Sequence, residues 1–192
     1  MTYHEYARTA LGETKLTTDA ALAVEWLRQA AEWGHAQAQN DLAVVCDRGQ
    51  MVTRDPAQAF EWFQKAADQG LKEAQYNLAS LYEDGQGVTQ DVAQAVHWYR
   101  QAADQGEPNA AYQLGMLYRD GKGMTSDTAQ AVHWFRQAAA SGHSSAGEIA
   151  RQIEASQSKD EPKPAVAPAA APTPVRGDAV ILGTGEVIES VF

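Results

Sequence analysis

Apolar residues recur along the chain at the spacing of an α-helix, and the same pattern then returns. In residues 72–84, Ala74, Leu78 and Leu81 occupy positions i, i+4 and i+7, which lie on one face of a helix. Residues 91–106 carry alanines and bulky aromatic residues at a similar spacing, which suits two helices that pack closely. A glycine follows each apolar stretch, as is typical of a helix end. The pattern predicts a helix–turn–helix unit.

The start of the second helix in each unit carries a capping signal. Asp91 is a good N-cap residue, and Gln94 stands three residues later, as in a capping box. Pro56 falls at the first helical position, where the missing N–H costs nothing. We therefore expect each second helix to begin directly after its aspartate. The same spacing recurs at Asp55 and Gln58, and at Asp127 and Gln130.

The unit repeats every 36 residues, and no insertion or deletion interrupts it from about residue 6 to residue 142. One such helix pair cannot bury its apolar face alone, whereas stacked copies bury one another. We therefore predict an all-α solenoid of about four units, at roughly 1–34, 35–70, 71–106 and 107–142. The residues that keep the period include Trp26, Trp62, Trp98 and Trp134, and Gly34, Gly70, Gly106 and Gly142.

Both ends of the predicted array differ from its middle. The first helix of the first unit is degenerate, because it lacks the leucine and tyrosine of the later copies. After the fourth unit the chain aligns with a first helix only, with Ala146, Ala150 and Ile153 on its apolar face. Glu154 replaces the tyrosine of earlier units and places a charge where a further unit would pack, as expected of a capping helix. The predicted solenoid domain therefore spans residues 1–156.

The composition changes after the predicted solenoid. Residues 157–178 hold five of the seven prolines, which predicts a disordered, Pro/Ala-rich linker. Residues 179–192 are apolar and β-prone, typical of a short strand or weak hairpin. The last three residues resemble the ligands of PDZ domains, so this motif is a candidate tethered recognition peptide. The sequence leaves open whether the tail binds a partner, serves as an export signal or is inert. The candidate motif is Ser190, Val191 and Phe192.

The charge balance excludes some classes of partner. The formal net charge is −10, from 15 Lys and Arg against 25 Asp and Glu, which argues against nucleic-acid binding and against docking on an anionic membrane. Neither a signal peptide nor an apolar run of about 18 residues is present, so no membrane insertion is expected. The single cysteine, Cys46, excludes a disulfide within the chain. We expect a cytoplasmic protein, with specialised secretion still open.

The fourth unit shows the full repeat pattern, A-x-x-x-L-G-x-L-Y-x-x-G-x-G-M-x-x-D-x-x-x-A-x-x-W-F-x-x-A-A-x-x-G, from Ala110 to Gly142. It resembles the Sel-one-like repeat (SLR), a relative of the tetratricopeptide repeat. The resemblance implies a right-handed α-solenoid that acts as an adaptor and holds a peptide or partner domain in its concave groove. Ala79 departs from the usual glycine, and Met51 replaces a turn glycine. We therefore expect a less regular turn in the second unit.

In tetratricopeptide-like stacks the first helices line the concave side, so the resemblance indicates which residues face a partner. The set mixes amides, which can bond a peptide backbone, with Tyr76 and Tyr112 as predicted anchors one repeat apart. The alternative is that these tyrosines only shield the seam between units. The candidate residues are Gln37, Asn40, Val44 and Asp47 in the second unit, Glu73, Tyr76, Ser80 and Glu83 in the third, and Asn109, Tyr112, Met116 and Arg119 in the fourth.

No catalytic, cofactor or metal site is expected. His97 and His133 precede two of the repeat tryptophans, but adjacent helices pack about 10 Å apart, too far for shared zinc ligands. Cys46 stands where later units have an inward tyrosine, so it is expected to be a core residue. The predicted function is a non-catalytic scaffold for protein partners. The alternatives are a secreted bacterial effector that uses the tail for export or docking, and an enzyme.

Overall fold

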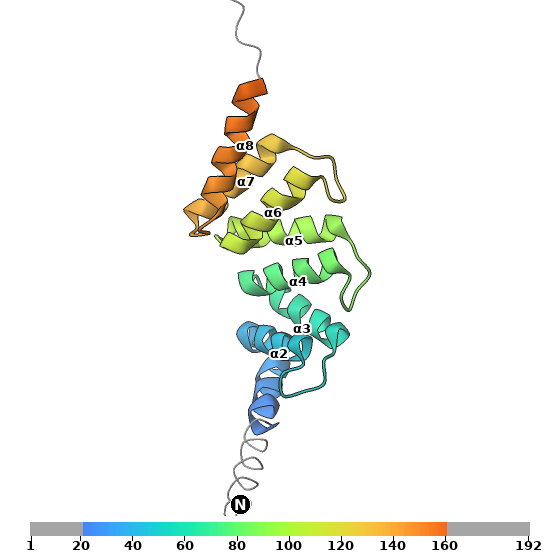
Figure 1. The fold of residues 1–192 in the computed structure, drawn as a ribbon. Coiled ribbons are helices and arrows are strands. Elements are labelled where there is room, and N and C mark those ends of the chain that lie inside the picture. The colour runs from blue at the N-terminus through green and yellow to red at the C-terminus, as the bar shows by residue number, and fades with distance from the viewer. Residues whose placement is uncertain (1–20, 161–192) are drawn as a thin grey trace, which may run out of the picture. The chain divides into compact units, whose positions relative to one another are not determined.

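The structure, a computed structural model, describes residues 21–160, with side chains up to residue 157. Within that range all regular elements are α-helices, and each helix packs against the next one along the chain (Figure 1). The predicted motif at 179–192 and most of the predicted linker lie outside the described residues. The helices are residues 21–32, α2 (Ala36–Arg48), α3 (Pro56–Asp68), α4 (Lys72–Asp84), α5 (Val92–Asp104), α6 (Pro108–Asp120), α7 (Thr128–Ala140) and α8 (Ala146–Asp160).

These helices are the predicted first and second helices in alternation. Helix 21–32 is the second helix of repeat 1, and repeats 2, 3 and 4 are the pairs α2–α3, α4–α5 and α6–α7. The last helix, α8, is a first-type helix with no described second helix after it. It ends at Asp160 rather than at residue 156, so the helical part extends further than the sequence predicted. The array is therefore the predicted α-solenoid.

The second helices α3, α5 and α7 begin at the predicted cap. The side chain of Asp91 accepts a hydrogen bond from the backbone N–H of Gln94 at 3.0 Å, and the caps of α3 and α7 have the same geometry. This bond satisfies one of the N–H groups that a helix start leaves without a partner. Each first helix ends at a glycine in the left-handed region, and the N–H of Gly85, for example, donates to the Leu81 carbonyl. The N-cap predictions are confirmed, whereas the capping-box bond is not, because the backbone N–H of each N-cap aspartate donates to a first-helix carbonyl, as Asp91 does to Tyr82 at 2.9 Å.

The turn between the two helices of a repeat is more constant than the sequence indicated. Gly87 and Gly123 both have a φ of 71°, and Met51, at the equivalent position of repeat 2, has a φ of 63°. The expectation of a less regular turn in repeat 2 was therefore wrong for the backbone at this position. A Cβ at Gly87 would lie 2.1 Å from the Pro56 carbonyl oxygen of the preceding repeat. Repeat 2 tolerates a methionine there, and its side chain is exposed.

The core runs through the repeats as a row of leucines against a row of aromatic rings. Leu78 and Leu114 are fully buried, and so are Tyr99 and Phe135 on the second helices. Gly115 makes room for one of these rings, since a Cβ there would lie 2.7 Å from the Phe135 ring. Close approach of first and second helices therefore depends on small residues opposite large ones.

The repeat tryptophans are not all sheltered, contrary to what their constant spacing indicated. Trp62 and Trp134 are buried, at 9% and 5% exposure, and Trp98 is partly buried. Trp26, the equivalent residue of repeat 1, is 66% exposed. The periodic residue is therefore the same in every repeat, whereas its environment depends on which helices the structure places beside it.

At the C-terminal end of the array, α8 packs as predicted for a capping helix. Ala146 and Ala150 are buried against α7. The carboxylate of Glu154 pairs with Arg136 at 2.7 Å. The equivalent residues one repeat earlier, Arg100 and Tyr118, form a hydrogen bond at 2.8 Å, in which the guanidinium donates to the hydroxyl oxygen. The charge of Glu154 therefore replaces an inter-repeat contact with an ion pair on the rim of the last helix.

Candidate partner-binding face

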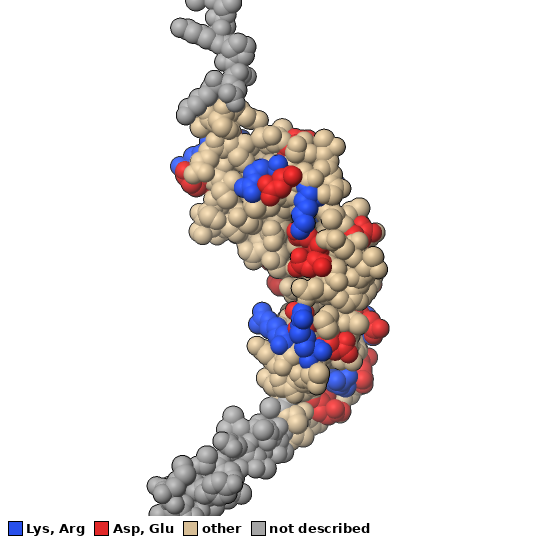
Figure 2. Space-filling model, turned by 45° about the vertical axis from the view of Figure 1, so that its right-hand side comes forward, with Lys and Arg blue, Asp and Glu red and all other residues tan. Residues whose placement is uncertain are grey.

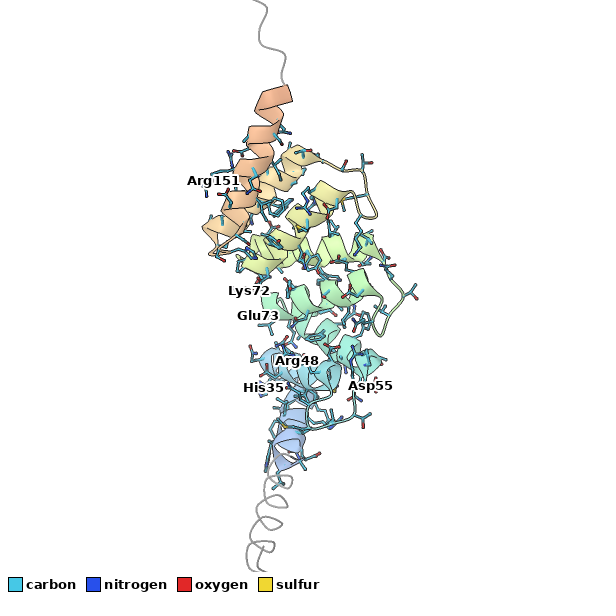
Figure 3. The ribbon with its side chains drawn as sticks, in the orientation of Figure 1. His35, Arg48, Asp55, Lys72, Glu73 and Arg151 are labelled. Carbon is cyan, nitrogen blue, oxygen red and sulfur yellow. The ribbon has the colours of Figure 1, made fainter. Side chains whose placement is uncertain are left out.

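The twelve predicted residues lie on α2, α4 and α6 and form four rows along the array, which we call the first-helix face. Side chains in a row are 36 residues apart and so occupy the same place on successive helices. Lys72 and Glu73 begin α4 at the same edge as His35, whereas Asp55 lies at the opposite edge with the turns (Figure 3). Exposed members are Gln37, Glu73, Asn109 and Arg119; half-buried members are Val44, Asp47, Tyr76, Ser80, Glu83, Tyr112 and Met116; and Asn40 is buried.

The two predicted tyrosine anchors pack against the second helices of their own repeats. The ring centroid of Tyr76 lies 5.7 Å from that of Tyr99, and the Tyr112 ring lies 5.6 Å from Phe135. Tyr112 is also stacked on His143, with centroids 4.2 Å apart and planes 11° apart. Both rings are therefore partly engaged in the seams, and what they offer a partner is an edge rather than a free ring face.

The hydroxyl of Tyr76 is tied to the next repeat. It shares a hydrogen bond with Gln113 of α6, and burial, with the nearby Glu107 and Glu83 carboxylates, raises its pKa. The equivalent contact one repeat earlier joins Asn77 to Asn40, with the Asn77 amide donating to the Asn40 side-chain oxygen at 3.2 Å. Asn40, the one predicted amide in these contacts, therefore spends part of its hydrogen-bonding capacity on joining α2 to α4.

Glu83 of α4 contacts both α5 and the turn that follows α6. The Tyr99 hydroxyl donates to one carboxylate oxygen at 3.0 Å, and the Lys122 ammonium lies 2.8 Å from the other. Burial and the adjacent Glu83 carboxylate raise the pKa of Tyr99 far above its usual range. The Lys122 ammonium is half-exposed, so the ion pair itself adds little stability. Glu83 nonetheless has a structural role that the sequence prediction did not assign.

Charges at the turn edge of this face are mostly paired within the chain. Arg54 lies 3.5 Å from the Asp47 carboxylate and donates to Gln86 of the next repeat at 2.5 Å. Arg119 pairs with its neighbour Asp120 at 2.6 Å. Positive and negative side chains alternate over the face that Figure 2 shows, without a continuous basic stripe. Such a surface favours a partner that is recognised by shape and hydrogen bonds rather than by a single strong charge.

A buried amide ladder between repeats was missed in the sequence. Gln39 and Gln75 are 5% and 2% exposed, and each donates to a carbonyl in the last turn of the preceding second helix. Each also accepts a hydrogen bond at 2.7 Å from a glutamine, Gln69 or Gln105, at the end of its own repeat. Buried helix ends need such partners. The glutamines of this ladder are polar residues at inward positions, so a search for hydrophobic periodicity does not detect them. Their 36-residue spacing, Gln39 to Gln75 and Gln69 to Gln105, is the signal in the sequence that could have indicated them.

In repeat 4 the ladder is replaced rather than continued. Ala111 stands where Gln39 and Gln75 stand, and it has no amide to donate. Gln137 of α7 instead donates to the carbonyl of Ala103 at 2.9 Å. The same backbone acceptor is therefore satisfied from a different helix, which shows that the seam requires the hydrogen bond and not a particular residue.

The histidines and the cysteine form no cluster. His97 and His133 are exposed and lie edge-on to their neighbouring tryptophans at 5.2 and 5.1 Å. In residues 21–160 no group of three His, Cys, Asp or Glu side chains is placed to hold a metal ion. Cys46 is buried and its thiol donates to the Gln58 side chain at 3.1 Å. Burial raises its pKa, which disfavours the reactive thiolate.

The first-helix face therefore offers a surface and not a reaction centre. None of the described helices is both long and apolar enough to cross a membrane. Residues 190–192, the candidate C-terminal motif, lie outside the described residues.

Comparison with known proteins agrees with this architecture. The Sel1 repeat model matches residues 9–35, 36–71, 72–107 and 108–143, so its boundaries fall within a residue or two of the predicted units from the second onward. None of the curated proteins matches the chain.

Three solved structures resemble the chain, and all come from bacteria. A Sel1 repeat protein from Oxalobacter formigenes is 33% identical, with a TM-score of 0.56, over 64% of this chain and 57% of its own. The protein c5321 of uropathogenic Escherichia coli, described as a protective antigen with an SLR fold, is 38% identical, with a TM-score of 0.63, over 72% of this chain and 33% of its own. Cysteine rich protein B of Helicobacter pylori is 23% identical, with a TM-score of 0.55, over 69% and 96%, and shows the fold alone. The chain thus spans little more than half of the first relative's length and a third of the second's.

Proposed function

Because the chain belongs to the Sel1 repeat family, we propose that it is a scaffold that binds a peptide segment of a partner protein across the first-helix face. Sel1 repeat proteins mediate protein–protein interactions, and the family is typically a non-catalytic repeat scaffold. The binding mode, the face and its residues are what this proposal adds.

The observation that carries the proposal is the row of exposed polar side chains at the start of the first helices. Gln37, Glu73 and Asn109 are exposed and stand one repeat apart. About two helical turns further along the same helices runs a partly buried row with apolar members, Val44 and Met116. A polar rim next to partly buried apolar positions is the anatomy of an interaction surface, where polar groups fix register and the apolar groups contribute most of the affinity.

The tyrosines contribute less as free anchors than the sequence suggested, and more as a rigid support. Each ring is held by an aromatic neighbour, so little side-chain entropy is lost when a partner contacts its edge. We therefore expect Tyr76→Phe to weaken partner binding only slightly, whereas Tyr76→Ala both removes the contact edge and loosens the seam between α4 and α6.

Site-specific photo-crosslinking tests the face directly. A benzophenone amino acid is placed at Glu73 or Asn109 on first helices, and in matched controls at Glu61 or Asp104 on second helices. All four positions are exposed, so none of these substitutions should disturb the core. Crosslinked partner peptides from the first-helix positions, with none from the controls, support the proposal. Crosslinks confined to the second-helix positions would refute it.

A further inference from the structure

Repeats 3 and 4 carry corresponding side chains on the same side of their first helices, but the chain uses the two sets differently. In each helix the three residues are spaced by four and then three positions, so they lie together on one side. We call the set on α6 the α6 patch. The three positions are Tyr76, Ser80 and Glu83 on α4, and Tyr112, Met116 and Arg119 on α6.

In repeat 3 all three side chains form hydrogen bonds within the chain. Tyr76 shares a hydrogen bond with Gln113 of the next first helix. The Tyr99 hydroxyl shares one with Ser80 and donates another to the Glu83 carboxylate at 3.0 Å. A partner that docked on this part of α4 would have to displace these bonds, so α4 is poorly suited to hydrogen-bond a ligand.

In repeat 4 the residues that would form these bonds are replaced by apolar ones. Phe135 stands where α5 has Tyr99, so it has no hydroxyl to offer α6. Ile149 of α8 stands where α6 has Gln113, so it has no amide to offer Tyr112. Within the described part of the chain, the Tyr112 hydroxyl accordingly has no hydrogen-bond partner. The repeat thus keeps the tyrosine but removes what occupies its hydroxyl.

The guanidinium of Arg119 is also left with unused donors. Its Nε and one Nη donate to the two carboxylate oxygens of the adjacent Asp120, at 2.6 and 3.2 Å. A guanidinium has five N–H groups, so its other edge remains free, and the side chain is 38% exposed. The hydrogen bond to Asp120 raises the pKa of Arg119, and the nearby Tyr112 hydroxyl adds to this shift. The α6 patch therefore holds two donors on either side of Met116.

The charges around these donors favour an uncharged acceptor. Asp120 already compensates the charge of Arg119, and the whole chain has a formal net charge of −10. A carboxylate of a partner would be repelled by both, whereas a carbonyl oxygen would accept from the same N–H and O–H groups without that cost. The ligand that fits the patch is therefore a carbonyl group.

Carbonyl groups next to an apolar contact are what an extended peptide offers. A helix uses its own carbonyls for internal hydrogen bonds, whereas an extended segment leaves them free and directs alternate side chains to opposite sides. Met116, partly buried between the donors, is an apolar seat for one such side chain. The ring of Tyr112 is held by stacking on His143 at 4.2 Å, so little freedom is lost when its hydroxyl is bound.

We propose that the α6 patch is the docking point for an extended segment of the partner protein, whose backbone carbonyls accept hydrogen bonds from Tyr112 and Arg119 while an apolar side chain packs on Met116. This inference rests on the proposed function and adds to it the repeat that binds and the chemistry of the bound segment.

The test uses the full chain and a fluorescent linear peptide selected on it from a phage-displayed library of random sequences. Benzophenone at Glu73 or Asn109 on first helices, or at Glu61 or Asp104 on second helices, shows which face the peptide occupies. Crosslinks from the second-helix positions alone would contradict the proposed function itself. Crosslinks from Asn109 are the result expected here, and they allow the α6 patch to be tested separately.

Substitutions then separate this patch from the rest of the face. Tyr112→Phe and Arg119→Met each remove a donor and should weaken peptide binding about three- to tenfold in fluorescence anisotropy. The matched variant Tyr76→Phe removes a hydroxyl that is already bonded and should weaken it by less than about twofold. Unchanged binding to both Tyr112→Phe and Arg119→Met, with crosslinks from Asn109 retained, would overturn this inference and leave the proposed function standing.

A glutamine at position 149 provides a converse test. Ile149→Gln supplies the residue that bonds Tyr76 in repeat 3, so it should occupy the Tyr112 hydroxyl and weaken the peptide about as much as Tyr112→Phe. Circular dichroism checks that the helices persist. Ile149→Gln that folds normally and binds the peptide as tightly as the original chain would contradict the assigned role of the hydroxyl.

Changes to the peptide identify the acceptor. An ester in place of one peptide bond weakens that carbonyl as an acceptor, so at the carbonyl bound by Tyr112 the losses from the ester and from Tyr112→Phe should not add. Additive losses at every position would overturn the assignment to the backbone. Selection of acidic peptides whose binding rises about tenfold in Asp120→Asn would show instead that the patch binds a carboxylate, which also overturns it.

Discussion

The two ends of the described array are built from the same repeat but are finished in opposite ways. At the C-terminal end, α8 presents the charged residues Glu148, Arg151 and Glu154 where an internal first helix presents a tyrosine, a glycine and a tyrosine. All three charges are neutralised locally, by the pairs Arg151–Glu148 at 2.9 Å and Arg136–Glu154 at 2.7 Å. At the other end, helix 21–32 presents Trp26 and Trp33.

This difference shows that the repeat pattern defines what a helix can pack against, and not what it does pack against. A tryptophan at the same repeat position is 9% exposed in α3 and 66% exposed in helix 21–32. In a solenoid each unit contacts only its neighbours, so an end position has the residues of an interface without the second half of it. The described residues therefore end in a charged surface on α8 and in an apolar one on helix 21–32.

The largest expected effect comes from placing a charge at equivalent positions of repeats 1 and 2. Ala59→Arg forces a guanidinium into a fully buried site and should cost about 3–5 kcal/mol of unfolding free energy. Ala23→Arg, at an exposed site, should change it by less than about 0.5 kcal/mol. Urea unfolding followed by circular dichroism measures both. An equally large loss in Ala23→Arg would mean that this side of helix 21–32 is covered in the free protein.

A methyl group in the turn of repeat 3 should have the next largest effect. Gly87→Ala places a Cβ 2.1 Å from the Pro56 carbonyl oxygen at a φ of 71°, so the turn must move away from α3. Strain and overpacking together should cost about 2–4 kcal/mol. Thermal unfolding by calorimetry measures the loss. Serine at Thr89, an exposed residue of the same turn, is a control that should leave the melting temperature unchanged.

The same turn position in repeat 2 should respond in the opposite direction. Met51 already has a φ of 63°. This left-handed backbone conformation is unfavourable for a residue with a side chain, but not for glycine. Met51→Gly should therefore stabilise the protein by about 0.5–1 kcal/mol, after the greater entropy of glycine in the unfolded chain is subtracted. Met51→Ala keeps the strained backbone and should show no gain. A gain in Met51→Ala equal to that in Met51→Gly would show that the exposed side chain, and not the backbone, is unfavourable.

The smallest effect concerns the ion pair that finishes the C-terminal end. The Arg136 side chain is 68% exposed, so replacing it with glutamine should cost no more than about 0.5 kcal/mol, and less in high salt. Arg100→Gln, which removes the equivalent contact to Tyr118, is the internal comparison. Urea titrations at low and high ionic strength distinguish the two. A salt-independent loss in Arg136→Gln would indicate that the arginine stem packs on α8 rather than pairing with Glu154.

Most of the fold could be predicted because its signals are local. The caps at Asp55, Asp91 and Asp127 depend on hydrogen bonds that span three residues, so the sequence places them directly. The prediction that Cys46 is a core residue is also confirmed, since its neighbours on the helix face are apolar. What the sequence could not show is the use of polar residues between repeats. Glu83 and the buried glutamines appear as surface residues in a hydrophobicity pattern.

For the candidate site, the sequence identified the correct helices but not the roles of the side chains on them. The predicted tyrosines lie on the first-helix face, yet their rings pack on Tyr99 and Phe135, and Tyr112 also stacks on His143. These contacts join residues more than twenty positions apart, which no helical period connects. Partner binding by these residues remains a prediction.

The sequence alone determined the number of repeats and the starts of the capped second helices, because those signals depend on the repeat spacing and on contacts within a few residues. The tertiary structure decided which copies of a repeated residue are buried, which amides are committed to seams, and which end of the described array remains apolar. Burial is a property of the neighbours that a residue acquires, so equivalent segments such as those around Trp26 and Trp62 differ in exposure.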